Sequence, residues 1–187
     1  RGINTQYFDN SNITNDKVKS IYSILNLNSE KTKILLPGRL TRWKGQEMFI
    51  ESLNLLKTNY KKGNFQAIIL GSHQGRTVYF KKLISLIEKY GLKKDVFFIN
   101  HIKEMPVAYY VSDIVVSSSI EPEAFGRISV EAQSMRRPIL ASNHGGSKET
   151  ILDGKSGFLF ENNNPQSLAE NLNKLIEMDK DKLQSIG

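Results

Sequence analysis

The sequence predicts an α/β fold in which a Rossmann-like parallel sheet of about six strands is flanked by helices. Short apolar runs alternate with stretches of helical periodicity nearly from end to end, the pattern of parallel strands joined by crossover helices. The runs are apolar at every position rather than at alternate ones, as expected of strands buried on both faces. The candidate motifs follow these runs, where the loops of an open parallel sheet bind ligands. The expected strands are residues 34–36, 67–70, 96–99, 114–116, 139–141 and 158–160.

Apolar residues at helical spacing predict the helices. The last helix has the clearest start, because Asn164 is a good capping residue and Pro165 suits the first helical turn. Gly91 stands where a C-terminal cap is expected after a helix over residues 78–90. The residues expected to face the core are Val18, Ile21 and Leu25, then Met48, Ser52, Leu53 and Leu56, then Val78, Leu83, Ile87 and Tyr90, and finally Leu168, Leu172 and Leu175.

Composition favours a single soluble domain. A chain of 187 residues is long enough for one well-filled core, and no apolar run approaches the roughly 20 residues of a membrane span. Residues 1–12 show no periodic pattern and are predicted to be a linker, which leaves 13–187 as the domain. The lack of cysteine and of a leader-like start favours the cytoplasm. The net charge of +7 favours anionic partners, although solvated lysines at helix ends explain much of it.

A basic turn over residues 38–45 follows the first expected strand. Gly38 lets the backbone approach a ligand, Arg39 can hold phosphate oxygens through two parallel hydrogen bonds, and Lys44 adds a second compact charge. The amide groups at the start of the next helix also favour an anion. The turn therefore predicts a diphosphate site, with a solvated turn as an equally weighted alternative. Its spacing is not that of a P-loop.

Two carboxylates, Glu123 and Glu131, stand with seven residues between them across an expected loop-to-helix junction. We expect Glu131 about two turns inside the helix and Glu123 in its entry loop, so that both reach one ligand. A carboxylate accepts hydrogen bonds from neighbouring hydroxyls, which suits Glu131 to a ribose and Glu123 to a pyranose. Phe125 and Gly126 can present backbone amides to a phosphate. Without that context, two surface charges would be the simpler interpretation.

Two weaker signals lie in other loops. Gly145 and Gly146 precede a further helix, where they either bring the backbone close to a sugar or make a tight connection. His73, His101 and His144 each follow an expected strand, but their spacing is not that of a metal site. We therefore interpret them as loop residues, of which His101 and His144 could line a site.

Taken together, these residues give the chain a resemblance to the C-terminal, nucleotide-sugar-binding half of retaining glycosyltransferases with the GT-B fold, the group 1 enzymes of glycosyltransferase family 4. The resemblance begins with residues 1–8, which are similar to an interdomain segment, and continues through Gly38-Arg39-Leu40 and Lys44-Gly45 to the glutamate pair. It ends with residues 145–146 and 153–159. The resemblance implies that residues 1–12 are the remnant of an interdomain linker and that an N-terminal acceptor domain is absent.

The resemblance implies a hexosyltransferase that moves a sugar from an NDP-sugar to a glycan or lipid acceptor in cell-envelope polysaccharide biosynthesis, with this isolated domain inactive alone. Arg39, Lys44 and Glu123 would be the catalytic residues, with the two cations on the donor diphosphate and Glu123 on the transferred sugar. Glu131 would hold the ribose. The other donor-binding residues that it implies are Gly38, Gly71, Ser72, His101, Ile102, Ala124, Phe125, Gly126 and Arg127.

No cofactor and no metal are expected, because the two cations can stabilise the departing nucleoside diphosphate. His101 stands where the family often has glycine, so the resemblance does not predict the shape of the nucleobase pocket. The expected partners are the nucleotide-sugar donor and the N-terminal domain of the same enzyme. Peripheral contact with the anionic cytoplasmic face of a membrane is a further expectation, and no nucleic acid is expected.

Three other functions stay open at this point. A sugar-nucleotide epimerase or phosphorylase would share the architecture, but the glutamate pair argues against it. A non-catalytic nucleotide-binding or interaction module would keep the anion site without the chemistry. A dinucleotide dehydrogenase should carry Gly-x-Gly-x-x-Gly after the first strand, and the first turn lacks that pattern. Nucleic-acid binding would rest on net charge alone.

Overall fold

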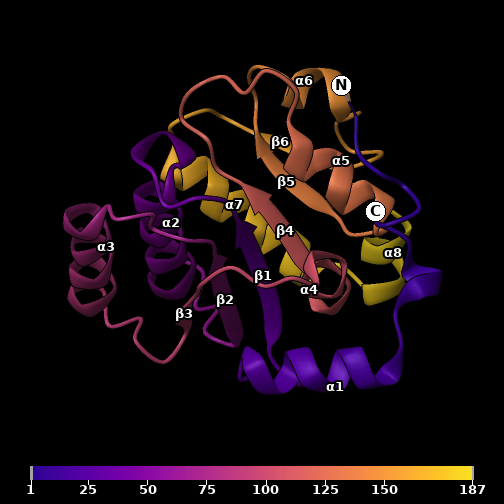
Figure 1. The fold of residues 1–187 in the computed structure, drawn as a ribbon. Coiled ribbons are helices and arrows are strands. Elements are labelled where there is room, and N and C mark those ends of the chain that lie inside the picture. Colours follow the sequence, from indigo (N-terminus) through magenta and orange to yellow (C-terminus); the bar gives the residue numbers. More distant parts are fainter. Residues whose placement is uncertain (1, 187) are drawn as a thin grey trace.

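A computed structural model describes residues 2–186 and confirms the predicted fold class (Figure 1). Six strands pair in parallel in the order β3-β2-β1-β4-β5-β6. The six expected apolar runs all form strands, and four of them extend into flanking residues as the ladder continues. The strands are β1 (Thr32–Pro37), β2 (Phe65–Leu70), β3 (Val96–Ile99), β4 (Ile114–Ser117), β5 (Ile139–Ser142) and β6 (Phe158–Phe160).

Helices cover both faces of the sheet. The α-helices are α1 (Asn15–Ile24), α2 (Gln46–Thr58), α3 (Thr77–Lys89), α4 (Met105–Val111), α5 (Arg127–Ser134), α6 (Ser147–Thr150), α7 (Pro165–Glu177) and α8 (Lys180–Ser185), and the 3₁₀ helices are η1 (Asn10–Asn12) and η2 (Arg42–Lys44). Within residues 2–186, no helix combines the length and the apolar character that crossing a bilayer requires.

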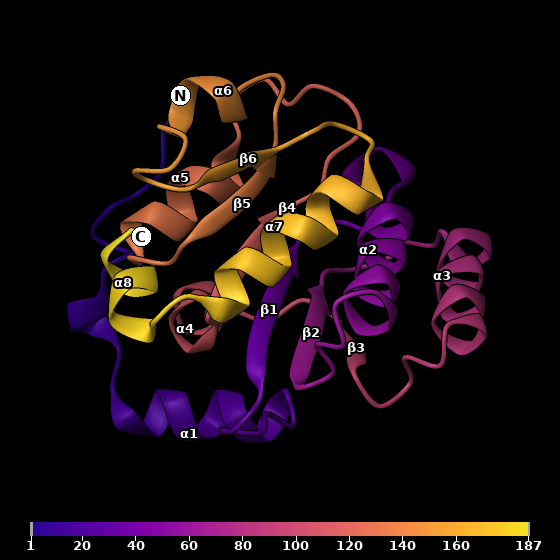
Figure 2. The same cartoon turned by 180° about the vertical axis from the view of Figure 1, so that it is seen from behind.

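Each face of the sheet has its own hydrophobic core, because successive strand residues point to opposite sides. In β1, Ile34 and Leu36 pack with the buried residues of α2, α3 and α7, whereas Leu35 packs with those of α1, α4 and α5. Figure 2 shows α7 and α2 in front of the sheet, on the side opposite to the one seen in Figure 1. This two-sided cover explains why the strands read as continuous apolar runs.

The predicted helix ends are confirmed in two places. The Asn164 side chain accepts a hydrogen bond from the Ser167 amide (3.0 Å) at the start of α7. After α3, the amide of Gly91 donates to the Glu88 carbonyl (3.1 Å), and the amide of the next residue donates to the Ile87 carbonyl (2.9 Å). This pair of bonds is a Schellman motif, which ends the helix.

The predicted core stripe of α3 is wrong at its first residue. Val78 is 81% exposed, whereas its neighbour Tyr79 is buried. The buried stripe is Tyr79, Leu83 and Ile87, spaced by four residues, so Val78 in the first turn falls on the solvent side. The Tyr79 hydroxyl donates to Gln46 Oε1 (3.1 Å) and thereby joins α3 to the start of α2.

The segment before α1 packs against the domain. The buried Phe8 ring meets the Tyr109 ring edge-on at 5.9 Å, and the Ser134 hydroxyl donates to the Phe8 carbonyl (2.7 Å). The Tyr7 hydroxyl donates to the Lys103 carbonyl (2.9 Å). These contacts tie the segment to α4 and α5, and its role as an interdomain linker remains a prediction.

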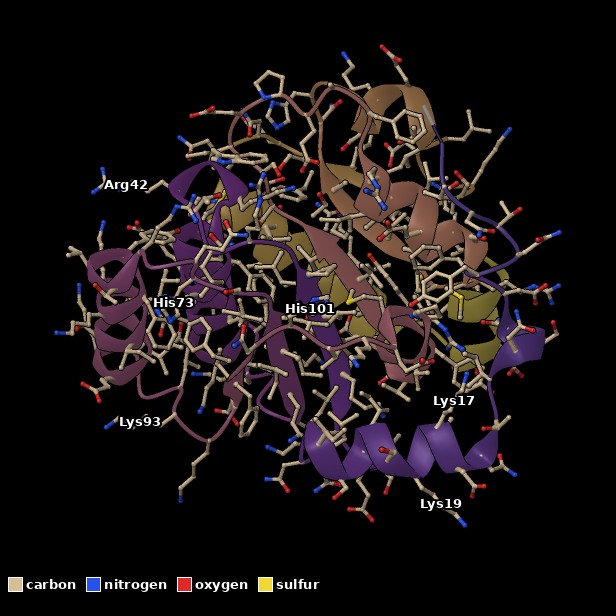
Figure 3. All side chains as sticks on the ribbon, in the orientation of Figure 1. Lys17, Lys19, Arg42, His73, Lys93 and His101 are labelled. Atoms are coloured by element: carbon tan, nitrogen blue, oxygen red, sulfur yellow. The ribbon has the colours of Figure 1, made fainter. Side chains whose placement is uncertain are left out.

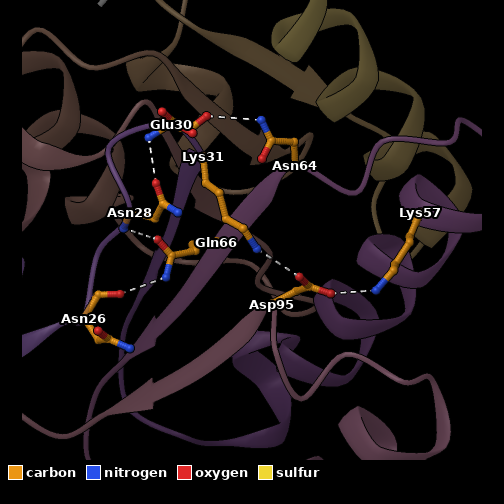
Figure 4. A network of polar contacts seen from close by, with 8 residues as sticks. All are labelled: Asn26, Asn28, Glu30, Lys31, Lys57, Asn64, Gln66 and Asp95. Atoms are coloured by element: carbon orange, nitrogen blue, oxygen red, sulfur yellow. Dashed lines mark hydrogen bonds and ion pairs between the residues drawn. The ribbon is translucent and has the colours of Figure 1, made fainter.

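The amino ends of the strands are joined by a polar network, drawn in Figure 4. Asp95, directly before β3, is only 5% exposed, and its two carboxylate oxygens accept hydrogen bonds from Lys31 (3.3 Å) and Lys57 (2.7 Å). The side-chain amide of Gln66, in β2, donates to one backbone group of the α1–β1 loop and accepts from another. Each polar atom of these two side chains therefore has a partner within the fold.

Candidate functional site

A cavity of about 660 Å³ lies beyond the carboxyl ends of β1, β2 and β4. The loops that follow strands β1 to β4 line it together with the start of α5, as expected for an open parallel sheet. His101, on the loop between β3 and α4, is labelled in Figure 3. The predicted site residues on its wall are Gly38, Arg39, Lys44, Gly71, Ser72, His101, Glu123, Ala124, Phe125, Gly126, Arg127 and Glu131.

The β1–α2 turn is tightly held. Gly45 ends η2 with a φ of 69°, and a Cβ added there would lie 1.9 Å from the Ser118 carbonyl oxygen at the end of β4. Only glycine allows that approach. The Ser118 hydroxyl donates to the Lys44 carbonyl (3.0 Å), and the buried Gln46 amide donates to the Arg39 carbonyl (2.9 Å). The backbone of both cationic residues is therefore fixed at the cavity wall.

Lys44 and Glu123 form an ion pair at the cavity wall. Lys44 Nζ lies 2.8 Å from Glu123 Oε1, and the two side chains are 13% and 15% exposed. The Ser119 hydroxyl donates to the same oxygen, and His144 Nε2 donates to the Ser119 carbonyl (2.8 Å). Within the described residues, Glu123 Oε2 accepts no hydrogen bond. One carboxylate oxygen is thus held, and the other keeps its capacity to accept from a ligand.

Glu131 is held from two sides. The buried Tyr109 hydroxyl donates to Oε2 (2.8 Å), and an Arg127 Nη donates to Oε1 (3.0 Å). Burial, with the Glu131 carboxylate second, raises the pKa of Tyr109 well above its usual value, so this hydroxyl remains a donor. Glu131 lies only one turn inside α5, not two as predicted, because the helix begins after Gly126, whose φ of 72° is left-handed.

The glycine pair supports the carboxylate loop. The Gly146 amide donates to the Glu123 carbonyl (2.7 Å), and a Cβ added at Gly146 would lie 2.4 Å from the Phe125 carbonyl carbon. Neither Gly145 nor Gly146 lines the cavity. Of the two interpretations open from the sequence, the structure favours the tight connection.

Ile102 is the one predicted donor-binding residue that does not line the cavity. It packs against the core beneath α1 and α4 and borders a separate hollow of about 400 Å³ between those helices. Its neighbour His101 lines the cavity. The two neighbouring side chains of the β3–α4 loop therefore face different surroundings, His101 the cavity and Ile102 the core.

Several residues of the wall were not assigned to the site from the sequence, namely Pro37, Trp43, Leu70, Gln74, Met105, Tyr109 and Ile128. Trp43 carried a usable signal, since a tryptophan within a basic turn can stack with a cation, and Lys44 Nζ lies 4.5 Å from its ring centroid. Tyr109 and Met105 carried none, because on an apolar helix they are indistinguishable from core residues.

The histidines do not form a cluster. His73 stacks on Phe80 with ring centroids 5.4 Å apart, His101 is exposed at the cavity, and His144 holds the Ser119 carbonyl. His73 and His101 lie apart on separate loops in Figure 3. Among residues 2–186, no three histidine, aspartate or glutamate side chains are arranged to hold a metal ion.

The chain matches a known protein family over most of its length. The family model described as glycosyl transferases group 1 matches residues 18–186. The D-inositol 3-phosphate glycosyltransferase of Paenarthrobacter aurescens is 30% identical over 160 residues, which are 83% of this chain and 38% of that protein. The chain thus spans well under half the length of this curated relative.

Solved structures show the same relation. A glycosyltransferase from Rickettsia africae superposes with a TM-score of 0.90 at 31% identity, over 99% of this chain and 48% of that one. Anabaena HepE, solved in complex with UDP-glucose, superposes with a TM-score of 0.88 at 28% identity, over 99% and 48% of the two chains. These matches confirm the resemblance to the C-terminal half of larger GT-B proteins.

Proposed function

This chain belongs to the family of group 1 glycosyl transferases, and we propose that it is the donor-binding part of an enzyme that transfers a hexosyl group from a nucleotide sugar to a glycan or lipid acceptor. It spans about half the length of its solved relatives. We therefore propose that an N-terminal domain supplies the acceptor site. The proposed setting is cell-envelope polysaccharide biosynthesis at the cytoplasmic membrane face.

The observation that carries the proposal is the meeting of two cations and two carboxylates on one cavity wall. Arg39 and Lys44 come from the β1–α2 turn, and Glu123 and Glu131 come from the β4–α5 loop and α5. Lys44 and Glu123 are 79 positions apart in the chain, yet their side chains touch. A nucleotide sugar offers the matching groups, an anionic diphosphate between two sets of hydroxyls.

We assign the diphosphate to Arg39 and Lys44. Arg39 is exposed on the cavity wall and makes no ion pair within the described residues, so its guanidinium is available to phosphate oxygens. Lys44 is already positioned by Glu123 and by the Trp43 ring. The start of α5, at Arg127, also faces the cavity, and its amide groups favour an anion.

We assign the hydroxyls to the carboxylates. Glu123 Oε2, which has no partner within residues 2–186, would accept hydrogen bonds from the transferred sugar. Glu131 would accept from the ribose at Oε1, where the exposed Arg127 is the present partner. The ribose hydroxyls can replace Arg127 there because the Arg127 side chain is 69% exposed and can turn to water.

The proposed chemistry is transfer of the sugar to an acceptor hydroxyl with retention of configuration. The bond from the anomeric carbon to the nucleoside diphosphate breaks, a bond to the acceptor oxygen forms on the same face, and the hydroxyl proton passes to the departing diphosphate. Negative charge develops on the leaving oxygen as the bond breaks, and Arg39 and Lys44 stabilise it from fixed positions. We propose that these two positive charges stabilise the leaving group without a resident metal. The Lys44 side chain, between Glu123 and the diphosphate, would couple sugar binding to leaving-group stabilisation.

Titration calorimetry of this chain with UDP, GDP and ADP and with their glucose conjugates tests the proposal. We expect binding of at least one nucleoside diphosphate, with UDP the first choice because of the UDP-glucose complex of Anabaena HepE. The double variant Arg39→Ala/Lys44→Ala should weaken that binding about a hundredfold or more, since hydrogen bonds to charged groups each contribute about 1.5–3 kcal/mol.

The matched control is Lys81→Ala/Lys82→Ala, which removes the same charge from α3, away from the cavity, and should bind as the wild type does. Absence of binding by all six ligands at millimolar concentration would contradict the proposal. We also expect no sugar transfer by this chain alone. Epimerisation of the donor without any acceptor would favour an epimerase instead.

A further inference from the structure

We propose that Tyr109 is a positioning residue. It holds the Glu131 carboxylate in the orientation that binds the ribose hydroxyls, and it thereby sets the preference of the site for ribonucleotides over deoxyribonucleotides. The inference rests on the proposed function, because it needs a nucleotide in the cavity. It assigns a role to a buried hydroxyl that lies on the far side of the Glu131 carboxylate from Arg127.

The two oxygens of Glu131 have partners of opposite character. Oε2 accepts from the hydroxyl of Tyr109, a side chain with no exposed surface. Oε1 accepts from Arg127, whose side chain is 69% exposed. A nucleotide can displace Arg127, which then hydrogen-bonds to water, whereas the Tyr109 hydroxyl lies behind the surface of the cavity wall with no exposed area. Tyr109 is thus the contact that persists when the ligand is bound, and Oε1 is the oxygen left for the ribose.

Burial explains why the carboxylate needs this anchor. Glu131 is only 8% exposed, and a carboxylate with an unpaired oxygen at such a site turns toward water if its side chain allows it. The Tyr109 hydroxyl remains protonated because burial raises its pKa well above the usual value. It can therefore only donate to the carboxylate, which fixes the plane of the carboxyl group.

The ring of Tyr109 is itself held in place. It meets the Phe8 ring edge-on at 5.9 Å, and the Phe8 carbonyl accepts from Ser134, three residues beyond Glu131 on α5. Phe8, Tyr109 and Glu131 thus form one packed unit that includes the segment before α1. A side chain so constrained can fix a second one without touching the ligand.

The variant Tyr109→Phe removes the hydroxyl and keeps the ring. For the nucleoside diphosphate that the wild type binds most tightly among UDP, GDP and ADP, calorimetry should show a loss of affinity of roughly tenfold, the size of one hydrogen bond to a charged group. Affinity for the 2′,3′-dideoxy form of the same nucleotide should change by less than about twofold, because that ligand offers Glu131 no hydroxyl. The preference for ribose therefore shrinks.

Tyr110→Phe is the matched control. It removes a hydroxyl from the next residue of α4, whose ring faces Arg137 at 4.9 Å rather than the cavity, and should leave both affinities unchanged. In a Glu131→Ala background, Tyr109→Phe should have no further effect on ribonucleotide affinity, since the two changes remove one interaction. A further loss in that background would overturn the inference.

Equal weakening of both nucleotides by Tyr109→Phe would also overturn it, because that result describes a residue needed only for the fold. If Tyr109→Phe does not fold, a structure of the wild-type complex decides the question. The Tyr109 hydroxyl must then remain on Oε2 with ribose hydroxyls on Oε1, and a ribose bound elsewhere refutes the inference. If the wild-type chain binds no nucleoside diphosphate, the proposed function is refuted as well. Binding without ribose preference refutes the inference and the assignment of the ribose to Glu131, but it leaves donor binding by Arg39 and Lys44 intact.

Discussion

The two edges of the sheet gather similar charged residues and use them differently. At the amino edge, Asp95 is paired with Lys31 and Lys57, and the hollow beside Lys31 measures only about 90 Å³. At the carboxyl edge, Lys44 and Glu123 are also paired, but they border a cavity of about 660 Å³. Both edges bring lysine and carboxylate side chains together from segments that are distant in the chain.

The difference lies in what remains unsatisfied. Both oxygens of Asp95 accept hydrogen bonds from lysines of the fold, so neither oxygen is without a partner. At the carboxyl edge, Glu123 Oε2 and the Arg39 guanidinium have no partner within the described residues. A charged cluster therefore indicates a binding site when its hydrogen-bonding capacity exceeds what the fold uses and space adjoins it.

The largest expected effect is a loss of stability when the ion pairs at the amino edge are removed. Asp95→Ala leaves two lysines without their shared carboxylate, and we expect the free energy of unfolding to fall by about 3 kcal/mol, the low end for a broken buried pair because both lysines can still reach water. Chemical denaturation measures it, and nucleotide affinity should not change. Glu88→Ala, which removes an exposed partner of Lys93, should barely alter stability. Weakened nucleotide binding by folded Asp95→Ala protein would contradict the division between the two edges.

A change of the same kind at the carboxyl edge should act on binding instead. Lys44→Met keeps most of the apolar stem but removes the charge, and we expect affinity for the bound nucleoside diphosphate to fall about thirtyfold, or about 2 kcal/mol. Calorimetry measures this loss. Lys82→Met is the control, since Lys82 pairs with Glu47 on the surface of α2 and α3. An unfolding free energy reduced as far as in Asp95→Ala would show that Lys44 is structural.

The smallest expected effect is on sugar binding at Glu123. Glu123→Gln keeps the shape and the Ser119 contact but weakens the acceptor for sugar hydroxyls and removes the partner charge of Lys44. We expect affinity for the nucleotide sugar to fall about fivefold relative to the nucleoside diphosphate, or about 1 kcal/mol. Competition titrations with the two ligands give this ratio. A parallel loss for both ligands would place Glu123 on the phosphate rather than the sugar.

Much of the fold and part of the site could be predicted from the chain. The six strands follow from continuous apolar runs, and the end of α7 that carries Asn164 follows from capping chemistry, because both depend on neighbours in sequence. The location of the cavity follows from topology, since parallel strands bring their carboxyl ends to one edge. Twelve of the thirteen predicted site residues line it for that reason, and Ile102 does not.

The architecture, the edge that holds the cavity and the residue types that line it follow from the order of the residues, because periodicity, glycine positions and parallel crossovers are local or topological properties. The length of α5 before Glu131, the exposure of Val78 and the carboxylate oxygens that stay without a partner depend on how the elements pack. Those features depend on contacts between elements, such as the contact of Tyr109 in α4 with Glu131 in α5. The distance between two packed helices and their relative rotation cannot be predicted from a local sequence pattern.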